Sequence, residues 1–235
     1  MNSIILDNAT GLINEPKVLE HLHLTLKAQV GDKLRCTILN DAHYIGEILT
    51  LTPSDCSLEL TKIKELHSPW FNLIVGLSRP QTTKKILEHA TTYGAGAFHF
   101  YKAVLSEKSY LDSKVFRDGQ ADDLMRLGLS QSALYGKAPL LKLDKFNPAS
   151  HYEQEKNKFI LDLNADKNVL DYKDEIDFNT PIYLAIGPER GYAKEDLEHF
   201  YNAGFKGIKI SSSVLRVEHA IYSSVAQFEL IRGKY

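Results

Sequence analysis

The stretch from Pro181 to Gly191 constrains the fold more than any other part of this chain. It opens with a continuous apolar run, Ile182–Ile186, which predicts a strand buried on both faces and therefore central in a parallel sheet. The run stops at Gly-Pro-Glu-Arg-Gly, where glycine allows a sharp turn and proline cannot continue a strand ladder. A helical pattern over residues 193–203 follows. Strand, glycine loop and helix in this order place a ligand beyond the carboxyl end of the strand.

A second unit of the same kind follows shortly afterwards. Residues 208–210 predict a strand and 211–213 a loop, and the chain from Val214 onward leads into a helix. Two such units side by side form one pocket from their two loops, whereas the plain alternative is two ordinary turns of an α/β sheet. Gly-Pro-Glu-x-Gly alone is a weak signal, but its pairing with Leu215-Arg-Val-Glu218 is specific.

The chain upstream supplies the other elements of such a sheet. A buried strand at 71–77, a helix from Pro80 to about Tyr93 and a strand at 97–101 follow one another, and this order indicates parallel pairing. The remaining predicted elements are a helix at 120–135, strands at 139–143 and 159–163, a short helix from Pro148 capped by Asn147, and a loop-rich passage at 164–180.

The first 67 residues are rich in predicted strands and favour a small barrel. Apolar or alternating runs at 34–39, 44–51 and 56–60 are separated by turn residues, and residues 19–26 suit either a short helix or a strand. The segment from Ser68 to Trp70 has the character of a linker. No cysteine or acidic partner stands at metal-ligand spacing from the histidines of this region, namely His21, His23, His43 and His67. We therefore expect no metal there or elsewhere in the chain.

Composition narrows the class of protein. The 235 residues carry a formal net charge of -2, and residues 1–67 hold six Lys/Arg against nine Asp/Glu, so composition alone shows no basic nucleic-acid footprint. The sequence contains neither a bilayer-length apolar stretch nor a recognisable signal peptide, which favours a cytoplasmic protein. Cys36 and Cys56 follow no disulfide pattern, and we expect both to be reduced and buried.

The paired motifs resemble the C-terminal signature of the ribosomal small-subunit RNA uridine-N3 methyltransferases of the SPOUT superfamily. That family reads Gly-Pro-Glu-Gly-Gly and then Leu-Gly-x-Arg-Ile-Leu-Arg-x-Glu-Thr-Ala. The positions that match are Gly187, Pro188, Glu189, Gly191, Leu215, Arg216, Glu218 and Ala220. The resemblance covers nearly the whole chain, through Val30-Gly-Asp32, Leu34-Arg35, Ser78-Arg-Pro80, Glu107-Lys-Ser-Tyr110 and Gly128-Leu-x-Gln131.

The resemblance implies an α/β protein with a PUA-like RNA-binding β-barrel at 1–67 and a SPOUT domain with a trefoil knot at 70–235. It also implies a homodimer that uses S-adenosylmethionine to methylate N3 of a uridine in the 16S RNA of the small ribosomal subunit. The cofactor is expected between the two loops, at Ile186, Gly187, Pro188, Gly191, Ile210, Ser211, Val214 and Leu215. In the acidic first domain the densest basic cluster, and so the expected RNA contact, is Lys27, Lys33 and Arg35.

Three side chains are candidates for the chemistry. Arg216 suits charge stabilisation on the uridine oxygens or contact with a phosphate. Glu218 and Glu189 suit proton acceptance or the orientation of Arg216. The plain alternatives are a structural ion pair between Arg216 and Glu218, and a Glu189 that only caps the helix after Gly191.

The chain departs from the family pattern at Arg190, Ser211, Ser213, His219 and Leu105. A second hypothesis is therefore a non-catalytic RNA-binding or ribosome-associated relative with the same fold. A third, a doubly wound enzyme for another nucleotide, is disfavoured because Gly-x-Gly-x-x-Gly and phosphate-loop patterns are missing.

Overall fold

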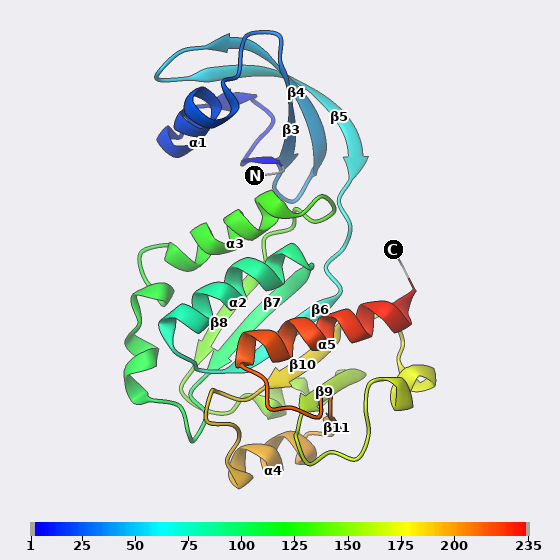
Figure 1. Ribbon diagram of the computed structural model, residues 1–235. Coiled ribbons are helices and arrows are strands. Elements are labelled where there is room, and N and C mark those ends of the chain that lie inside the picture. Colours follow the sequence, from blue (N-terminus) through cyan, green and yellow to red (C-terminus); the bar gives the residue numbers. More distant parts are fainter. Residues whose placement is uncertain (1–2, 234–235) are drawn as a thin grey trace. The chain divides into compact units, whose positions relative to one another are not determined.

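The computed structural model describes residues 3–233, and the chain forms two compact units (Figure 1). The first unit comprises the chain up to Ser68 together with Arg126–Ala138. The second comprises Pro69–Met125 and the chain from Pro139 onward. The domain boundaries drawn from the sequence stay a prediction, and the segment 126–138 groups with the first unit although it lies far from it along the chain.

The first unit contains a mixed five-stranded sheet. Its strands, in the order β1-β3-β4-β5-β2, are Ile4–Leu6, Lys33–Ile38, Ala42–Leu51, Cys56–Glu65 and Leu12–Ile13. β1 runs parallel to β3 and the other pairs are antiparallel. The strands predicted at 34–39, 44–51 and 56–60 are confirmed. The sheet order has β1 and β2 at its ends, so a closed barrel is not shown.

The segment left open between helix and strand in the first unit is helical. A short helix α1 (Pro16–Glu20) continues into one π-helical stretch η1 (His21–Leu26). Leu22 from this stretch packs fully buried in the core of the sheet, together with Cys36 and Cys56. Both cysteines are free thiols, as predicted, and burial raises the pKa of Cys36 to about 12.

The second unit is built on a six-stranded sheet in which every pairing is parallel. Its strands, in the order β11-β9-β10-β6-β7-β8, are Lys206–Ile208, Asn157–Leu161, Ile182–Ile186, Phe71–Gly76, Ala95–Tyr101 and Leu140–Asp144. The prediction that residues 182–186 form a central strand is confirmed, because β10 lies between β9 and β6. The two predicted loop units are not adjacent, however, since β9 separates β10 from β11.

The helices begin and end close to the predicted positions. They are α2 (Pro80–Thr92), α3 (Gln120–Gln131), α4 (Lys194–Asn202) and α5 (Val217–Arg232), with short 3-10 helices η2 (Lys108–Asp112), η3 (Lys114–Phe116), η4 (Ala149–Tyr152) and η5 (Leu170–Glu175). Pro80 opens α2 at its first turn, where the missing proline N–H leaves no hydrogen bond unmade. Among residues 3–233, no helix has the length and apolar character that crossing a bilayer requires.

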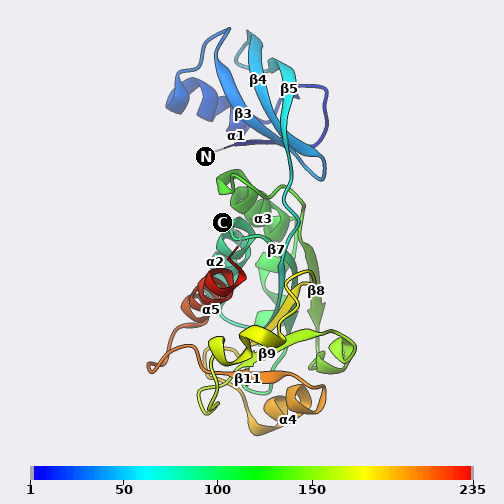
Figure 2. The same cartoon turned by 90° about the vertical axis from the view of Figure 1, so that its right-hand side faces the viewer.

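The sheet of the second unit is covered on both faces. Phe159 on β9 packs against Phe228 of α5, and its neighbour Ile160 joins a cluster with Phe200 and Phe205 around α4. Because successive strand residues point to opposite faces, α5 and α4 cover opposite sides of the sheet. Figures 1 and 2 show α2 and α5 together on one side. The result is a three-layer unit whose strand ends remain free to form a site.

An ion pair joins the two helices on the α2 and α5 face. Lys85 Nζ of α2 lies 3.2 Å from Glu218 Oε1 in the first turn of α5, and Tyr222 Oη donates to Lys85 O. The Glu218 side chain is only 5% exposed. Burial acts to raise the pKa of this carboxyl, but a hydrogen bond from its own backbone N–H and the Lys85 ammonium outweigh burial, so the pKa lies below its ordinary value of 4.5.

This pair predicts a pH-dependent contribution to stability. A lowered folded-state pKa stabilises the fold above the unfolded value, and the contribution is lost as pH falls through the folded value. Glu218→Gln is therefore expected to lower the free energy of unfolding by about 1–3 kcal/mol near neutral pH. The gap from wild type is expected to narrow as pH falls below 4.5 and to close once pH passes below the lowered folded-state pKa of Glu218, as measured by urea denaturation across pH.

The matched control for this experiment is Glu198→Gln. Glu198 pairs with Lys194 on α4 at 3.5 Å, but both side chains are well exposed, so its loss is expected to change stability by less than about 1 kcal/mol. A gap between Glu218→Gln and wild type that stays constant down to strongly acidic pH would contradict the role assigned to this pair.

Candidate functional site

A cavity of about 1230 Å³ lies at the carboxyl ends of neighbouring strands in the second unit. Ile186 ends β10, Leu161 ends β9 and Ile208 ends β11, and all three residues line it. Because these strands run parallel, the segments that follow them emerge at the same edge of the sheet. The volume exceeds the roughly 300–1,000 Å³ of ordinary ligand pockets, which leaves room for a cofactor and part of a second molecule.

The first wall is the Gly-Pro-Glu loop after β10. The Gly191 N–H donates to Pro188 O at 2.8 Å and closes a turn, and Gly191 has φ +75°, a left-handed conformation that favours glycine. The backbone of Arg190 does not have a positive φ. Arginine therefore stands at this family glycine position without backbone strain.

Gly76 belongs to neither motif, but its close packing against the Gly-Pro-Glu loop requires a glycine at this position. A Cβ atom added at Gly76, the last residue of β6, would lie 2.6 Å from Pro188 Cδ. Real Cβ atoms do not approach that closely, so any larger residue at this position would displace the loop from the end of the strand. Gly76 thus sets the position of Pro188 in the cavity wall.

The second wall is the serine loop after β11. Ser211 Oγ accepts a hydrogen bond from the Ser213 N–H at 3.0 Å, a local turn in which the hydroxyl replaces a backbone acceptor. Gln227 Nε2 of α5 donates to Ile210 O at 3.0 Å and ties the loop to the helix. Neither serine has a positive φ, so the departures from the family pattern at Ser211 and Ser213 also cause no backbone strain.

The structure brings the predicted cofactor residues together. All of them line the cavity, from both loops, namely Ile186, Gly187, Pro188, Gly191, Ile210, Ser211, Val214 and Leu215. They come from two segments separated by α4 and β11, so their convergence is a property of the fold. Their assignment to a cofactor stays a prediction.

The three predicted catalytic side chains also line this cavity, but they form no hydrogen bond or ion pair with one another. Glu218 pairs with Lys85, and Glu189 Oε1 accepts a hydrogen bond from the Arg79 N–H at 2.8 Å, at the start of α2. Glu189 therefore caps α2 and not the helix after Gly191. Arg216 is exposed and forms no side-chain hydrogen bond or ion pair among residues 3–233, so neither glutamate orients it.

Cationic side chains predominate in the cavity lining. Five basic residues face three acidic ones there, although the whole chain has a net charge of -2. The basic residues are Arg79, Lys85, Arg190, Lys209 and Arg216, and the acidic ones are Asp162, Glu189 and Glu218. This local excess of positive charge suits a polyanionic ligand, a preference that composition alone did not show.

Sequence reasoning missed two groups of lining residues. One is the segment after β9, where Asp162 accepts hydrogen bonds from Tyr201 Oη at 2.7 Å and from the Asn164 N–H. The other is the start of α2, represented by Arg79 and Lys85. The Ser78-Arg-Pro80 match in the sequence marked the second group, but nothing in the sequence placed β9 between the two motif strands.

The predicted RNA contacts lie in the first unit. Lys33 and Arg35 stand two residues apart on β3 and so share one face of the strand. Lys27 directly follows η1 and has a left-handed φ of 51°. All three are exposed. Lys33 Nζ also lies 3.8 Å from Glu47 Oε2 on the neighbouring strand, a loose surface pair.

Known proteins resemble this chain over most of its length. A ribosomal RNA small subunit methyltransferase E 1 from Borreliella burgdorferi is 26% identical over 223 residues, which cover 90% of this chain and 89% of that protein. A ribosomal RNA small subunit methyltransferase E from Treponema pallidum is 24% identical over 215 residues, covering 88% and 80%.

Solved structures share the fold at low sequence identity. A ribosomal RNA small subunit methyltransferase E from Neisseria gonorrhoeae, bound to S-adenosyl methionine, superposes with a TM-score of 0.82 at 17% identity and covers 98% of both chains. A putative methyltransferase from Legionella pneumophila, in complex with the same cofactor, has a TM-score of 0.77 at 16% identity over 97% of each chain.

A family model decides the broader class. The model of the RNA methyltransferase domain matches residues 65–229, a span that contains both motif loops and every residue that lines the cavity. This span is well over half of the chain, and the resemblance drawn from the motifs is confirmed at this level. The chain belongs to the family of RNA methyltransferases that this domain defines.

Proposed function

We propose that this protein transfers a methyl group from S-adenosylmethionine to N3 of a uridine in the RNA of the small ribosomal subunit. The observation that carries the proposal is the cavity in which both motif loops, every predicted cofactor residue and Arg216 converge. The relatives named as small-subunit RNA methyltransferases support the substrate, and the cofactor-bound structural neighbours support the methyl donor. Such a substrate places the protein with ribosomes in the cytoplasm.

The protein contributes to this reaction mainly by positioning the two reactants and by stabilising negative charge on the uridine. The donor supplies an electrophilic methyl on a sulfonium, and N3 becomes nucleophilic as its proton leaves. Arg216 is exposed at the cavity, and its planar guanidinium stays charged and matches the oxygens that gain negative charge. We assign proton acceptance to Glu189, because the Glu218 carboxylate is already paired with the Lys85 ammonium at 3.2 Å.

The alternative is a relative that binds RNA without catalysis. The main support for this alternative is the set of positions at which the chain departs from the family motifs. Two observations weigh against it: Arg190, Ser211 and Ser213 fit their loops without strained backbone, and the cavity remains open in their presence. We therefore favour the enzyme.

The proposal also includes the domain architecture. The first domain (1–67) is a PUA-like barrel, and the second (70–235) is a SPOUT domain with a trefoil knot. The family resemblance is the argument for both.

The proposed homodimer requires a surface on α5. The apolar side chains of this helix at Ile221, Val225 and Phe228 are buried within the chain. A partner would therefore contact the outer face of the helix, where Leu230 is 68% exposed. Light scattering at micromolar concentration is expected to give twice the chain mass of 26.5 kDa, and a monomer mass would contradict the dimer.

The proposed RNA contacts predict a change in salt dependence. Each phosphate contact releases counterions, so the double change Lys33→Ala and Arg35→Ala is expected to reduce the salt slope of RNA affinity by about 1 per contact. Filter binding to small-subunit RNA fragments across salt concentrations measures this slope. The matched control is Lys62→Ala on the same sheet, because Lys62 Nζ already pairs with Glu65 at 2.7 Å. Equal slopes for wild type and the double variant would exclude the assignment.

Arg216 is the side chain whose change tests the chemistry. Hydrogen bonds to charged groups contribute about 1.5–3 kcal/mol, so Arg216→Ala is expected to slow methyl transfer by roughly ten- to a hundred-fold. Calorimetric affinity for S-adenosylmethionine and the melting temperature are expected to stay near wild type, because Arg216 has no side-chain partner among residues 3–233. Arg216→Lys is expected to restore activity only in part, since an ammonium cannot form the planar pair.

Arg117→Ala is the matched control for this series. Arg117 is exposed, pairs with Asp112 at 3.0 Å and does not line the cavity, so its loss is expected to leave transfer unchanged. An Arg216→Ala variant that melts early but keeps its specific activity would make Arg216 a structural brace. Wild-type protein that gives no heat on titration with S-adenosylmethionine would overturn the proposed function itself.

A further inference from the structure

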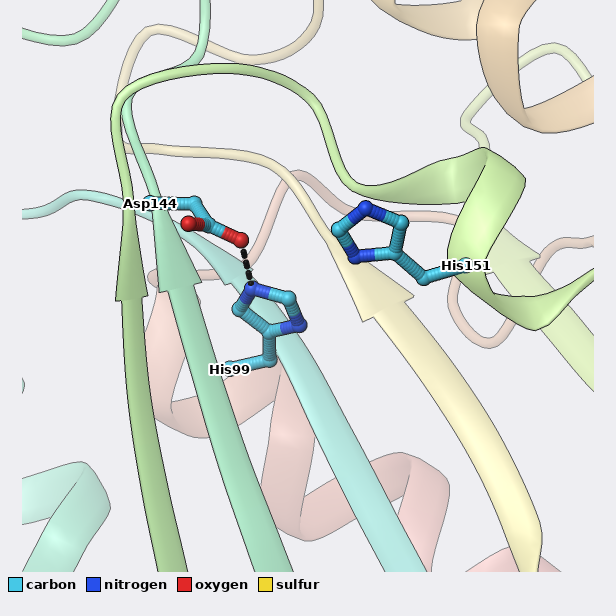
Figure 3. Close-up of side chains that lie close together, drawn as sticks. All are labelled: His99, Asp144 and His151. Carbon is cyan, nitrogen blue, oxygen red and sulfur yellow. Dashed lines mark hydrogen bonds and ion pairs between the residues drawn. The ribbon is translucent and has the colours of Figure 1, made fainter.

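Three metal-ligating side chains gather outside the cavity already described. His99, Asp144 and His151 each offer one ligand atom, and these atoms all lie within 4.8 Å of one another. None of the three residues lines the cavity. They come from β7, from the end of β8 and from η4, and Figure 3 shows the three side chains converging on one point. Among residues 3–233 this is the one group of three histidine, cysteine or acidic residues at such distances.

Strand register brings the first two ligands together. His99 pairs with Lys142 across the parallel β7 and β8 strands, and Asp144 follows Lys142 by two residues. Residues two apart on a strand share a face, so the Asp144 carboxylate lies on the same side of the sheet as the His99 imidazole. Their atoms Oδ2 and Nε2 are 2.6 Å apart.

The third ligand is held by a braced turn. Asn147 Oδ1 accepts a hydrogen bond from the Ala149 N–H at the start of η4, and Ala149 itself is buried in the core. The Lys158 ammonium donates to the carbonyl of Tyr152 at the end of the same turn. The His151 ring lies 6.1 Å from that of His99, at an interplanar angle of 21°. Hydrogen bonds at both ends of η4 therefore hold the backbone that carries His151.

A further contact fits His99 for the role of a ligand. Its other nitrogen, Nδ1, lies 2.6 Å from Tyr152 Oη. Histidines that bind metals commonly donate their second ring N–H to an oxygen, which sets the tautomer and the orientation of the ring. The His99 side chain is 3% exposed and that of Asp144 is 44% exposed, so the group is anchored on one side and open to solvent on the other.

We propose that His99, Asp144 and His151 form a site for a divalent transition-metal cation of the zinc class. Two imidazoles and one carboxylate are ligands that zinc accepts, and three protein ligands leave a coordination position for water. Binding displaces the proton shared by His99 Nε2 and Asp144 Oδ2 to solvent, and these two atoms move apart from 2.6 Å, because zinc bonds of about 2.0–2.2 Å need a wider separation between two ligands. The imidazole then carries its hydrogen on Nδ1, and this N–H donates a hydrogen bond to Tyr152 Oη.

A bound cation would connect η4 to the ends of β7 and β8. His151 lies on η4, whereas the other two ligands lie at the ends of β7 and β8. A cation bound to all three stabilises the folded chain by mass action, because the ligands are not assembled in the unfolded chain. The four histidines considered in the sequence do not belong to this group, and two of them have other partners: His23 Nε2 lies 2.9 Å from Thr52 O and His43 Nδ1 lies 2.9 Å from Thr37 Oγ1.

The test is calorimetric titration of zinc chloride into the full chain, freed of metal by a chelator and carrying no histidine tag. Wild type is expected to bind one equivalent of zinc and to melt at a higher temperature when zinc is added. His151→Ala is expected to lose at least about 100-fold in zinc affinity, and Tyr152→Phe about 10-fold through the second ring nitrogen. Cobalt(II) is expected to give a visible absorption band with wild type that His151→Ala lacks.

The controls separate this site from nonspecific binding. His199→Ala removes another exposed histidine, which lies 3.9 Å from Glu195 on α4, and is expected to bind zinc as wild type does. His151 is exposed, so its alanine variant is expected to melt like wild type in the absence of zinc. Equal zinc affinity in wild type and His151→Ala would overturn the proposal and leave the contact between His99 and Asp144 as a structural hydrogen bond. No readout depends on methyl transfer.

Discussion

The parallel pairing of β10 with β6 on one side and β9 on the other is the constraint on which the site depends. Parallel strands release their following segments at a common edge, so the Gly-Pro-Glu loop must lie beside the chain that leaves β6 and β9. Gly76 makes the contact close enough for Pro188 to form part of the wall. Glu189 then caps α2, so the same loop both shapes the cavity and fixes a helix on the sheet.

Local signals in the sequence were sufficient for the elements and for much of the cavity. The apolar run at 182–186 and the helix at Pro80 appear as predicted, because both depend on near neighbours: continuous burial for the strand and the fixed φ of proline for the helix. The two loops predicted to hold a cofactor were located for a related reason, whereas the cofactor itself was assigned from the family resemblance. Their residues sit where strands end, and strand ends can be predicted from the turn residues that follow.

Features that depend on strand order could not be predicted in this way. Periodicity predicts that β9 is a strand, but it does not say that β9 lies between β10 and β11, which is why Asp162 was missed as a lining residue. The same holds for His99 and Asp144. They lie far apart in the sequence and meet only through the register of β7 and β8. The alternative in which Arg216 pairs with Glu218 is excluded because Lys85, on a helix distant in the sequence, is the partner of Glu218.

Net charge is a poor guide to ligand choice in a chain of this size. Interactions between exposed charges are screened over about 10 Å at ordinary ionic strength, so a bound phosphate responds to the side chains around it and not to the sum over the molecule. Here the sum is -2, yet the cavity lining has two more basic than acidic residues. Burial increases the effect of the basic residues on a ligand, because the buried Glu218 is paired with Lys85 whereas Arg216 is exposed at the cavity. An acidic protein can therefore present a cationic site, provided that the fold gathers its arginines at the ends of the strands.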